Sequence, residues 1–311
     1  MRTLDVVVPC YNEEPCIDLL YQHLSETLHG LPDLKWSVIF VDDGSSDQTM
    51  EKILDLEQRE SGDIIKYVSF SRNFGKESAI FAGLSYSSAE YVVLMDADLQ
   101  HPPELLPQMM DALEEGYDCC GAKRVTRGGE PPIRSFLSKG FYRLTTHMMN
   151  VDLHNGGSDF MMMKRHVVDA MTAMPERGRF TKGIMAWVGF ETKWLEYENV
   201  ERAAGTTKWS VGSLTRYAIG GIISFSNAPF MWAIWLGGLV DLATLIAAVV
   251  FIIRTAVRGG AWGTGLLVLL GLFFCGTVIL MLGMLGEYMA QIYREVQRRP
   301  VFIVKKSNIQ K

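Results

Sequence analysis

The sequence lacks the patterns that mark several large classes of protein. Its five cysteines form no paired Cys-x-x-Cys pattern, and an odd number at such spacings is typical of a protein in a reducing compartment. The adjacent Cys119 and Cys120 are expected in the core. No internal repeat or low-complexity segment occurs. The first residues hold neither a long apolar run nor a small-residue cleavage site, so we expect no signal peptide and a soluble part that stays in the cytoplasm.

Most of the chain also lacks a surplus of basic residues. The formal net charge is −5. The residues from Ser226 onward include eight Lys and Arg and three Asp and Glu, a charge of about +5, so the preceding residues carry about −10. Binding to bulk nucleic acid needs a basic face, so no nucleic-acid partner is expected. An acidic catalytic part does suit metal-assisted handling of an anionic ligand, because carboxylates hold the cation.

Long apolar runs occur only in the last third of the chain, at 228–253 and 261–286. A bilayer core about 30 Å thick needs roughly 20 helical residues, so the two runs predict a transmembrane hairpin. Lys and Arg are more frequent after the second run than in the short loop. This bias predicts a multi-pass protein of the inner (cytoplasmic) membrane with both termini in the cytoplasm. Asp241 shares a helix face with Gly237 and Gly238, which favours a role in helix packing over one in transport.

Before these runs, apolar strand patterns alternate with helical patterns. Strands are expected over Leu4–Val8, Trp36–Val41, Ile64–Phe70, Tyr91–Met95 and Tyr117–Gly121, and helices over Glu13–His29, Ser46–Glu57, Glu77–Tyr86 and Pro103–Glu114. This alternation predicts an α/β fold with a mostly parallel sheet and helices on both faces. Ligands of such sheets bind at the carboxyl ends of the strands.

The composition divides the chain into four parts. We expect a cytoplasmic catalytic domain over 1–209, a juxtamembrane amphipathic segment over 210–227, two transmembrane helices within 228–286 and a basic cytoplasmic tail over 287–311. The stretches Ser135–Asn150 and Ser210–Phe225 are candidates to lie in the membrane interface. For the first of them, an ordinary helix packed on the sheet fits equally well.

Polar residues follow three of the expected strands. Asp42 and Asp43 follow the second strand, and Asp96, Asp98 and Gln100 follow the fourth. Because strand side chains alternate between faces, carboxylates two residues apart can converge and bind a hard divalent cation through oxygen. The first strand leads into Pro9–Glu14, which offers an aromatic ring, an amide and two acids. These residues suit a helix start capped by Asn12, a ligand site, or both.

Together these segments resemble the family-2 inverting glycosyltransferases with the GT-A (Rossmann-like) fold. The resemblance depends on Val8–Glu14, Val41–Asp47, Ser71–Lys76 and Asp96–Glu104, and it extends to the tail segment Gly286–Pro300. It is strongest to the polyprenyl-phosphate group, which includes dolichyl-phosphate mannose synthase and the bactoprenol glucosyltransferases. The resemblance implies a nucleotide-sugar donor, Mg²⁺ or Mn²⁺, and a polyprenyl (undecaprenyl) phosphate acceptor in the membrane.

The resemblance also implies roles for particular residues. The nucleobase and ribose would lie against Pro9, Tyr11, Glu13 and Asp43, and the metal and diphosphate against Asp96, Asp98 and Gln100. Arg202 and Lys208 would steady the diphosphate as charge builds on the leaving group. The lipid phosphate would be held by Arg124, Arg134 and Ser138, since arginine makes paired bonds to phosphate. A solvated basic loop is the alternative for that segment. Asp159 would act near the acceptor, as a general base or as an orienting charge.

Several functional alternatives stay open. The tail resembles the bactoprenol glucosyltransferases, which favours glucose from UDP-glucose, while GDP-mannose and a UDP-aminopentose are the other donors considered. A processive polysaccharide synthase would carry a Gln-x-x-Arg-Trp motif and several spans, and neither is visible. A catalytically idle membrane scaffold would not need Asp96, Asp98, Asp159 and Arg202. A homo-oligomer assembled through the apolar runs is expected.

Overall fold

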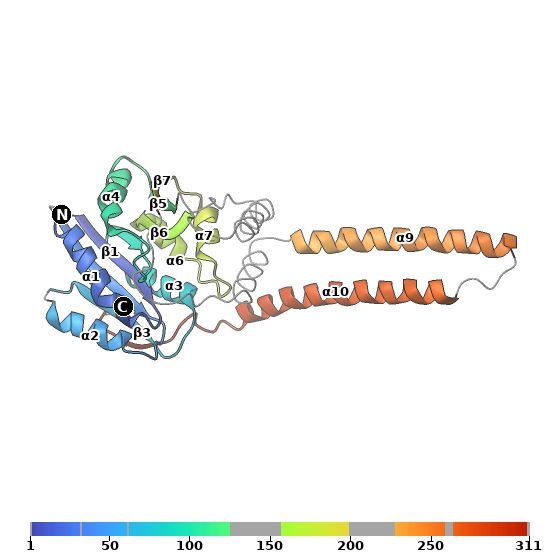
Figure 1. Cartoon of the computed structure of the whole chain (residues 1–311), viewed down its shortest axis with the longest axis horizontal. Helices are drawn as coiled ribbons and strands as arrows, with labels where there is room; N and C mark the ends of the chain where they lie inside the picture. The colour runs from blue at the N-terminus through green and yellow to red at the C-terminus, as the bar shows by residue number, and fades with distance from the viewer. Residues whose placement is uncertain are drawn as a thin grey trace. The chain divides into compact units, whose positions relative to one another are not determined.

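The computed structural model describes residues 2–31, 33–60, 62–124, 157–198, 228–258 and 264–309. The expected interface stretches 135–150 and 210–225 lie outside these ranges. The chain forms two compact units, Met1–Gly221 with Pro300–Lys311, and Ile222–Arg299. The elements of each unit are labelled in Figure 1.

The described part of the first unit is built on an eight-stranded sheet with the order β7-β5-β6-β4-β1-β2-β3-β8. The strands are β1 (Arg2–Cys10), β2 (Leu34–Asp42), β3 (Ile65–Phe70), β4 (Tyr91–Leu94), β5 (Cys119–Arg124), β6 (Gly157–Lys164), β7 (Thr192–Tyr197) and β8 (Val304–Ser307). The four strands β4, β1, β2 and β3 run parallel, as the alternating pattern predicts.

The other half of the sheet is less parallel than expected. β5 does not pair with β4, because β6 lies between them and runs antiparallel to both. β7 then pairs parallel to β5. The sheet is therefore mixed, and the strand that breaks the parallel order brings residue 159 to the carboxyl end of β4.

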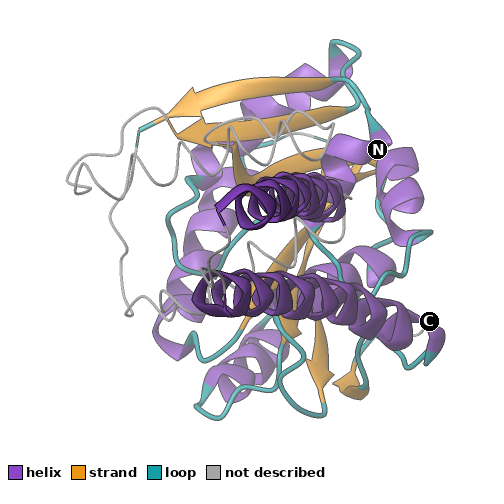
Figure 2. Cartoon of the chain, turned by 90° about the vertical axis from the view of Figure 1, so that its right-hand side faces the viewer, coloured by secondary structure: helices purple, strands orange, loops and turns teal. Residues whose placement is uncertain are grey.

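Helices cover both faces of the sheet (Figure 2). On one face, Leu4, Val6 and Val8 of β1 share a core with apolar residues of three helices: α1 (Glu14–Leu28), α2 (Thr49–Arg59) and α4 (Leu106–Glu114), the last preceded by a short 3-10 helix over Pro103–Leu105. On the other face, α3 (Lys76–Tyr86) packs on β1 beside α6 (Arg165–Thr172). A Cβ at Gly83 would lie 2.2 Å from Val7 Cγ1, so glycine permits this close packing. Cys119 and Cys120 are buried, as expected.

The end of the chain returns to the first unit as a strand, which the basic composition of 287–311 did not predict. β8 pairs antiparallel with β3. Phe302 stacks on Phe70 with ring centroids 5.0 Å apart. The Asn308 side chain accepts a hydrogen bond from Tyr67 N (2.8 Å) and donates one to Ile65 O (3.0 Å). The tail is therefore an integral edge of the sheet.

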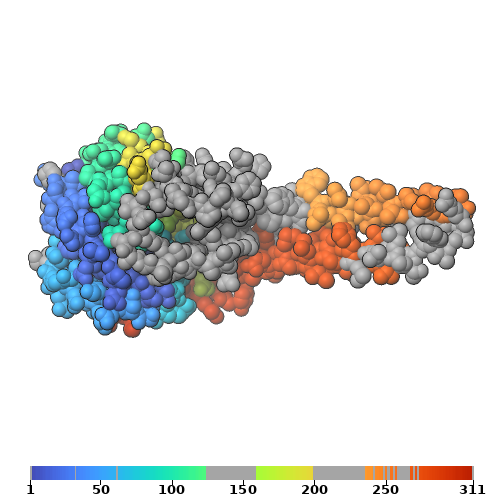
Figure 3. Space-filling model, in the orientation of Figure 1, coloured from blue at the N-terminus to red at the C-terminus, as the bar shows by residue number. Residues whose placement is uncertain are grey.

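The second unit contains two helices, α9 (Ala228–Arg258) and α10 (Thr264–Val296), which lie side by side (Figures 1 and 3). Both extend past the C-terminal ends of the expected spans. A Cβ at Gly237 would lie 2.3 Å from Met281 Cε, so Gly237 lies in the packed face, while the Asp241 side chain lies outside the description. Within the described ranges, one stretch, Phe273–Val296, is long and apolar enough to cross a membrane. The two-helix hairpin remains a prediction.

Candidate active site

Three of the sequence motifs meet at one edge of the sheet. They follow β1, β2 and β4, which are parallel neighbours, so their carboxyl ends lie together. Asp43 N donates a hydrogen bond to Cys10 O (2.9 Å), and Met95 N donates to Val7 O (3.0 Å). The backbone that precedes each motif is therefore fixed by the neighbouring strand.

The loops after β1 and β2 are joined by hydrogen bonds. Asn12 N donates to Ser45 Oγ (2.9 Å), and Ser46 N donates to Asn12 Oδ1 (2.8 Å). The expected capping role of Asn12 is wrong, since the cap position of α1 is Glu13 and no side chain caps it. Asn12 instead adopts a left-handed conformation, with φ +52°, and ties the two loops together. Tyr11 is 38% exposed beside it, so its ring lies at the rim of the site.

Asp43 connects the β2 loop to the segment Ser71–Lys76. Its carboxylate accepts hydrogen bonds from Phe74 N (2.6 Å) and Gly75 N (2.9 Å). The next residue, Gly44, has φ +68°, and a Cβ there would lie 2.5 Å from the carbonyl carbon of Arg72. The contact between the two loops therefore needs the carboxylate of Asp43 as an acceptor and the missing side chain of Gly44. A role for Asp43 toward a nucleobase stays a prediction.

The pKa of Asp43 predicts a pH dependence of donor binding. Burial raises this pKa to about 6, although the Phe74 and Gly75 amides lower it. Below pH 6 the carboxyl takes up a proton and loses an acceptor for those amides. For the nucleotide-sugar donor that the sequence resemblance implies, with UDP-glucose as the probe, we expect the affinity at saturating metal to fall by up to about tenfold per pH unit below 6. Calorimetric titration between pH 5 and 8 measures this. Asp43→Asn should bind the nucleotide sugar weakly at every pH. If the affinity of that variant still fell below pH 6 as it does in the natural protein, the pH dependence would not come from Asp43.

The turn after β4 is held by His101. Asp96 N donates to His101 Nδ1 (3.0 Å), so the ring proton lies on Nε2. The buried ring stacks on Phe160 at a centroid distance of 5.1 Å. Burial, with Lys76 nearby, lowers the pKa of His101 despite the surrounding carboxylates, which keeps the ring neutral.

Within the turn, Gln100 N donates to Asp98 Oδ1 (3.2 Å), and Leu99 has φ +60°. A left-handed leucine is strained, and such strain is typical of functional turns.

The antiparallel strand β6 brings Asp159 to this turn. Its register pairs Met161 with Leu94 of β4. Two further steps along each strand place Asp159 opposite Asp96. The ammonium of Lys76, the first residue of α3, lies 2.7 Å from Asp96 Oδ1 and 2.7 Å from Asp159 Oδ2. A second ammonium, that of Lys182, lies 3.5 Å from Asp159 Oδ1.

These ion pairs decide the charge of the cluster. Burial raises the pKa of Asp159, but Lys182 and Lys76 outweigh it and hold the pKa well below the usual range. Burial likewise lowers the pKa of Lys76, and Asp159 and Asp96 outweigh it, so this pKa lies above its ordinary value. Asp159 and Lys76 are therefore both charged at neutral pH.

Lys182 is placed by a contact between two helices. It is the second residue of α7 (Thr181–Val188). Glu77 of α3 accepts hydrogen bonds from Thr181 N (2.8 Å) and Thr181 Oγ1 (2.5 Å). The same first turn of α3 thus presents Lys76 directly and Lys182 through α7.

The turn after β4 fits a hard divalent cation. Asp96, Asp98 and Gln100 offer carboxylate and amide oxygens, which Mg²⁺ and Mn²⁺ prefer. The Lys76 ammonium already shows that Asp96 Oδ1 attracts a cation. Among the described residues, no group of three or more His, Cys, Asp or Glu side chains is arranged to hold a metal ion. Ligand oxygens and water would therefore complete the coordination.

The structure describes some of the predicted site residues and not others. Pro9, Tyr11, Glu13, Asp43, Asp96, Asp98, Gln100 and Asp159 lie at or beside the carboxyl edge of the sheet. Arg124 is the last residue of β5, and the structure does not describe its side chain. Four further predicted residues lie wholly outside the described ranges: Arg134, Ser138, Arg202 and Lys208. Sequence reasoning gave no role to Lys76, Lys182 or His101. Lys76 and His101 stand inside the quoted motifs, which was the available signal; Lys182 had none.

A sheet with helices on both faces and an Asp-x-Asp turn at the carboxyl ends of its strands matches the arrangement of the GT-A glycosyltransferase fold. The fold is similar to glucosyl-3-phosphoglycerate synthase from Mycobacterium tuberculosis, solved with Mn²⁺, UDP and glucosyl-3-phosphoglycerate. The TM-score is 0.52 at 20% identity, over 72% of this chain and 80% of that one.

The sequence gives the family. The model for glycosyl transferase family 2 matches residues 5–172. The chain is 38% identical to the putative glycosyltransferase CsbB of Bacillus subtilis, over 98% of this chain and 92% of the relative. It is 36% identical to the SfII prophage-derived bactoprenol glucosyl transferase of Shigella flexneri, over 98% of each. The protein belongs to glycosyltransferase family 2.

Proposed function

We propose that this enzyme transfers a single glucose from UDP-glucose to polyprenyl (undecaprenyl) phosphate, with inversion, at the cytoplasmic face of the inner membrane. The observation that carries the proposal is the convergence of Asp96 and Asp159 at the carboxyl edge of the sheet, bridged by Lys76. Relatives named bactoprenol glucosyl transferases, which match over nearly the whole chain, support the choice of lipid and sugar.

The donor would lie along the edge formed by the loops after β1, β2 and β4. Tyr11 would offer a ring face for the nucleobase, and Pro9, Glu13 and Asp43, from the ends of β1 and β2 and the loops that follow them, would line the same part of the donor site. Asp96, Asp98 and Gln100 would hold the divalent cation, which supplies positive charge to the diphosphate when bound. Arg202 and Lys208 would add charge on the leaving-group side.

The acceptor would enter from the side of Asp159. A lipid phosphate oxygen attacks the anomeric carbon, the bond to the diphosphate breaks, and the configuration inverts. A monoester phosphate has its second pKa near 6, so it is mostly ionised at neutral pH and needs no strong base. The low pKa of Asp159 makes it a weak base. Asp159 therefore acts as a fixed charge that orients Lys76 and Lys182, while Arg124, Arg134 and Ser138 hold the phosphate.

The second unit would anchor the enzyme beside its lipid substrate. We assign 228–253 and 261–286 to a transmembrane hairpin, with 1–209 and 287–311 in the cytoplasm and 210–227 at the interface. The apolar stretch Phe273–Val296 supports an anchor at α10. Contacts between such helices from several subunits would give a homo-oligomer.

A donor screen tests the proposal. The full chain in lipid is given Mn²⁺ or Mg²⁺, a short polyprenyl phosphate and radiolabelled UDP-glucose, GDP-mannose or a UDP-aminopentose. We expect one sugar per lipid, from UDP-glucose, and no transfer with EDTA. Transfer from another nucleotide sugar would replace the donor, a polymer would indicate a processive synthase, and no transfer from any donor would overturn the proposal.

A further inference from the structure

The Lys76 ammonium contacts the Asp96 carboxylate, which the proposed function assigns to a divalent cation. Its ammonium is equidistant from Asp96 and Asp159, at 2.7 Å from each. We propose that Lys76 is a tethered cation that competes with the divalent metal for Asp96, and that its displacement turns the ammonium toward a phosphate oxygen of the bound substrates. The inference rests on the proposed function and gives a task to a lysine that Asp159 orients but to which the proposed chemistry assigns no contact with metal or substrate.

Competition follows from the charges in the cluster. Mg²⁺ binds a carboxylate oxygen at about 2.0–2.1 Å, inside the distance at which Lys76 now contacts Asp96 Oδ1. An ammonium and a metal ion on the same carboxylate repel each other strongly in a partly buried site. Metal binding at Asp96 therefore requires Lys76 to leave Oδ1.

The surroundings allow the side chain to move while its backbone stays fixed. Asp43 holds Phe74 and Gly75, the two residues that precede Lys76. The Lys76 side chain is 36% exposed, so packing does not enclose it on all sides. A lysine has a flexible stem and three donors, and the two carboxylates account for two of them. The third donor suits a phosphate oxygen, and Asp159 keeps the ammonium nearby during the exchange.

The test measures metal binding without donor or acceptor. Free Mn²⁺ is followed by electron paramagnetic resonance during titration of the full chain in detergent. Lys76→Gln should bind Mn²⁺ about tenfold more tightly than the natural protein because the competing charge is gone. The same variant should transfer sugar at least tenfold more slowly, since its phosphate contact is lost. Lys76→Arg keeps the charge and should bind Mn²⁺ as weakly as the natural protein.

Lys182→Gln is the matched control, because it removes a cation from Asp159 rather than from Asp96. Its Mn²⁺ affinity should change by less than about twofold. Equal or weaker Mn²⁺ binding by a folded Lys76→Gln protein, checked by circular dichroism, would overturn the inference. So would equal tightening in Lys182→Gln. Absence of sugar transfer by the natural protein would instead count against the proposed function, which the Mn²⁺ titration does not involve.

Discussion

Asp96→Asn is expected to lower the rate of sugar transfer by about a thousandfold or more. The substitution keeps the size of the side chain and removes its negative charge. That charge attracts the Lys76 ammonium, and it would hold the divalent cation beside the diphosphate. Without it the leaving group would carry its charge uncompensated. The measurement is the initial rate of labelled sugar transfer at saturating donor and acceptor, over a range of Mn²⁺ concentrations.

Asp111→Asn is a suitable control for that variant. Asp111 lies on the exposed face of α4 and outside the motifs, and the same change in charge there should leave the rate within about twofold. A loss in Asp96→Asn that excess Mn²⁺ fully restores would show that the carboxylate sets only metal affinity. A rate close to that of the natural protein would remove Asp96 from the catalytic site.

The parallel half of the fold was predictable because its signals are local. Each of the first four strands is an apolar run followed by a helical pattern, and the observed strands and helices begin and end within a few residues of the expected ones. Parallel strands place their carboxyl ends at one edge. The meeting of the Pro9–Glu14, Asp42–Asp43 and Asp96–Gln100 segments therefore followed from the sequence with no knowledge of tertiary contacts.

The antiparallel additions were not predictable in the same way. β6 takes its place between β4 and β5 through pairing with residues far away in the chain, and β8 is a four-residue strand with two lysines and no apolar alternation. The bridge between Asp96 and Asp159 depends on the register of β6 against β4. Lys76 joins that bridge only because α3 begins there. Sequence reasoning named both carboxylates and missed the cation between them.

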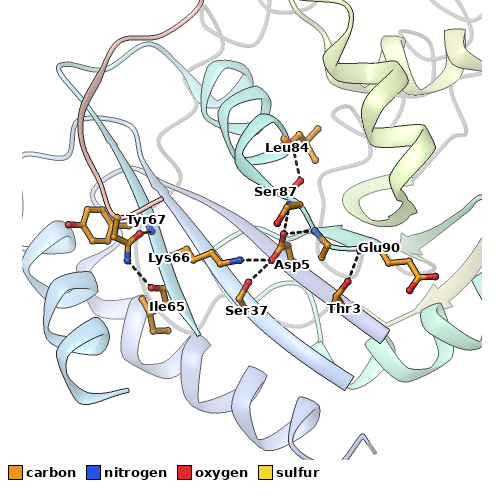
Figure 4. A network of polar contacts seen from close by, with 12 residues as sticks. Thr3, Asp5, Ser37, Ile65, Lys66, Tyr67, Leu84, Ser87 and Glu90 are labelled. Atoms are coloured by element: carbon orange, nitrogen blue, oxygen red, sulfur yellow. Dashed lines mark hydrogen bonds and ion pairs between the residues drawn. The ribbon is translucent and has the colours of Figure 1, made fainter. Parts of the chain in front are cut away.

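Asp5→Ala is expected to destabilise the catalytic unit by about 3–5 kcal/mol, the usual cost of removing one partner from a buried ion pair. Asp5 is 2% exposed and lies in the first half of β1, away from the strand end that leads into the active site. Its carboxylate accepts hydrogen bonds from Ser37 Oγ (2.5 Å), Lys66 Nζ (3.2 Å), Ser88 N (2.8 Å) and Ala89 N (3.0 Å), a network shown in Figure 4. Alanine leaves all four donors without this acceptor.

The loss should appear as a fall in melting temperature on the order of 10 °C, followed by circular dichroism of the full chain in detergent. Asp5→Asn keeps one acceptor oxygen and should fall between alanine and the natural protein. Ser37→Ala removes a single hydroxyl and should cost about 1 kcal/mol. A fall of less than about 2 °C for Asp5→Ala would contradict the assigned role.

The same network fixes the direction of the pH dependence. Burial raises the pKa of Asp5, but Ser37, Lys66 and the amides of Ser88 and Ala89 outweigh it, so the pKa is lower in the folded protein than its unfolded value of 3.8. The folded protein therefore binds this proton more weakly than the unfolded chain. The resulting stabilisation is present above pH 3.8 and is lost as the pH falls through the folded-state pKa. The gap in melting temperature between the natural protein and Asp5→Ala should accordingly be constant from pH 6 to 8 and narrow at strongly acid pH.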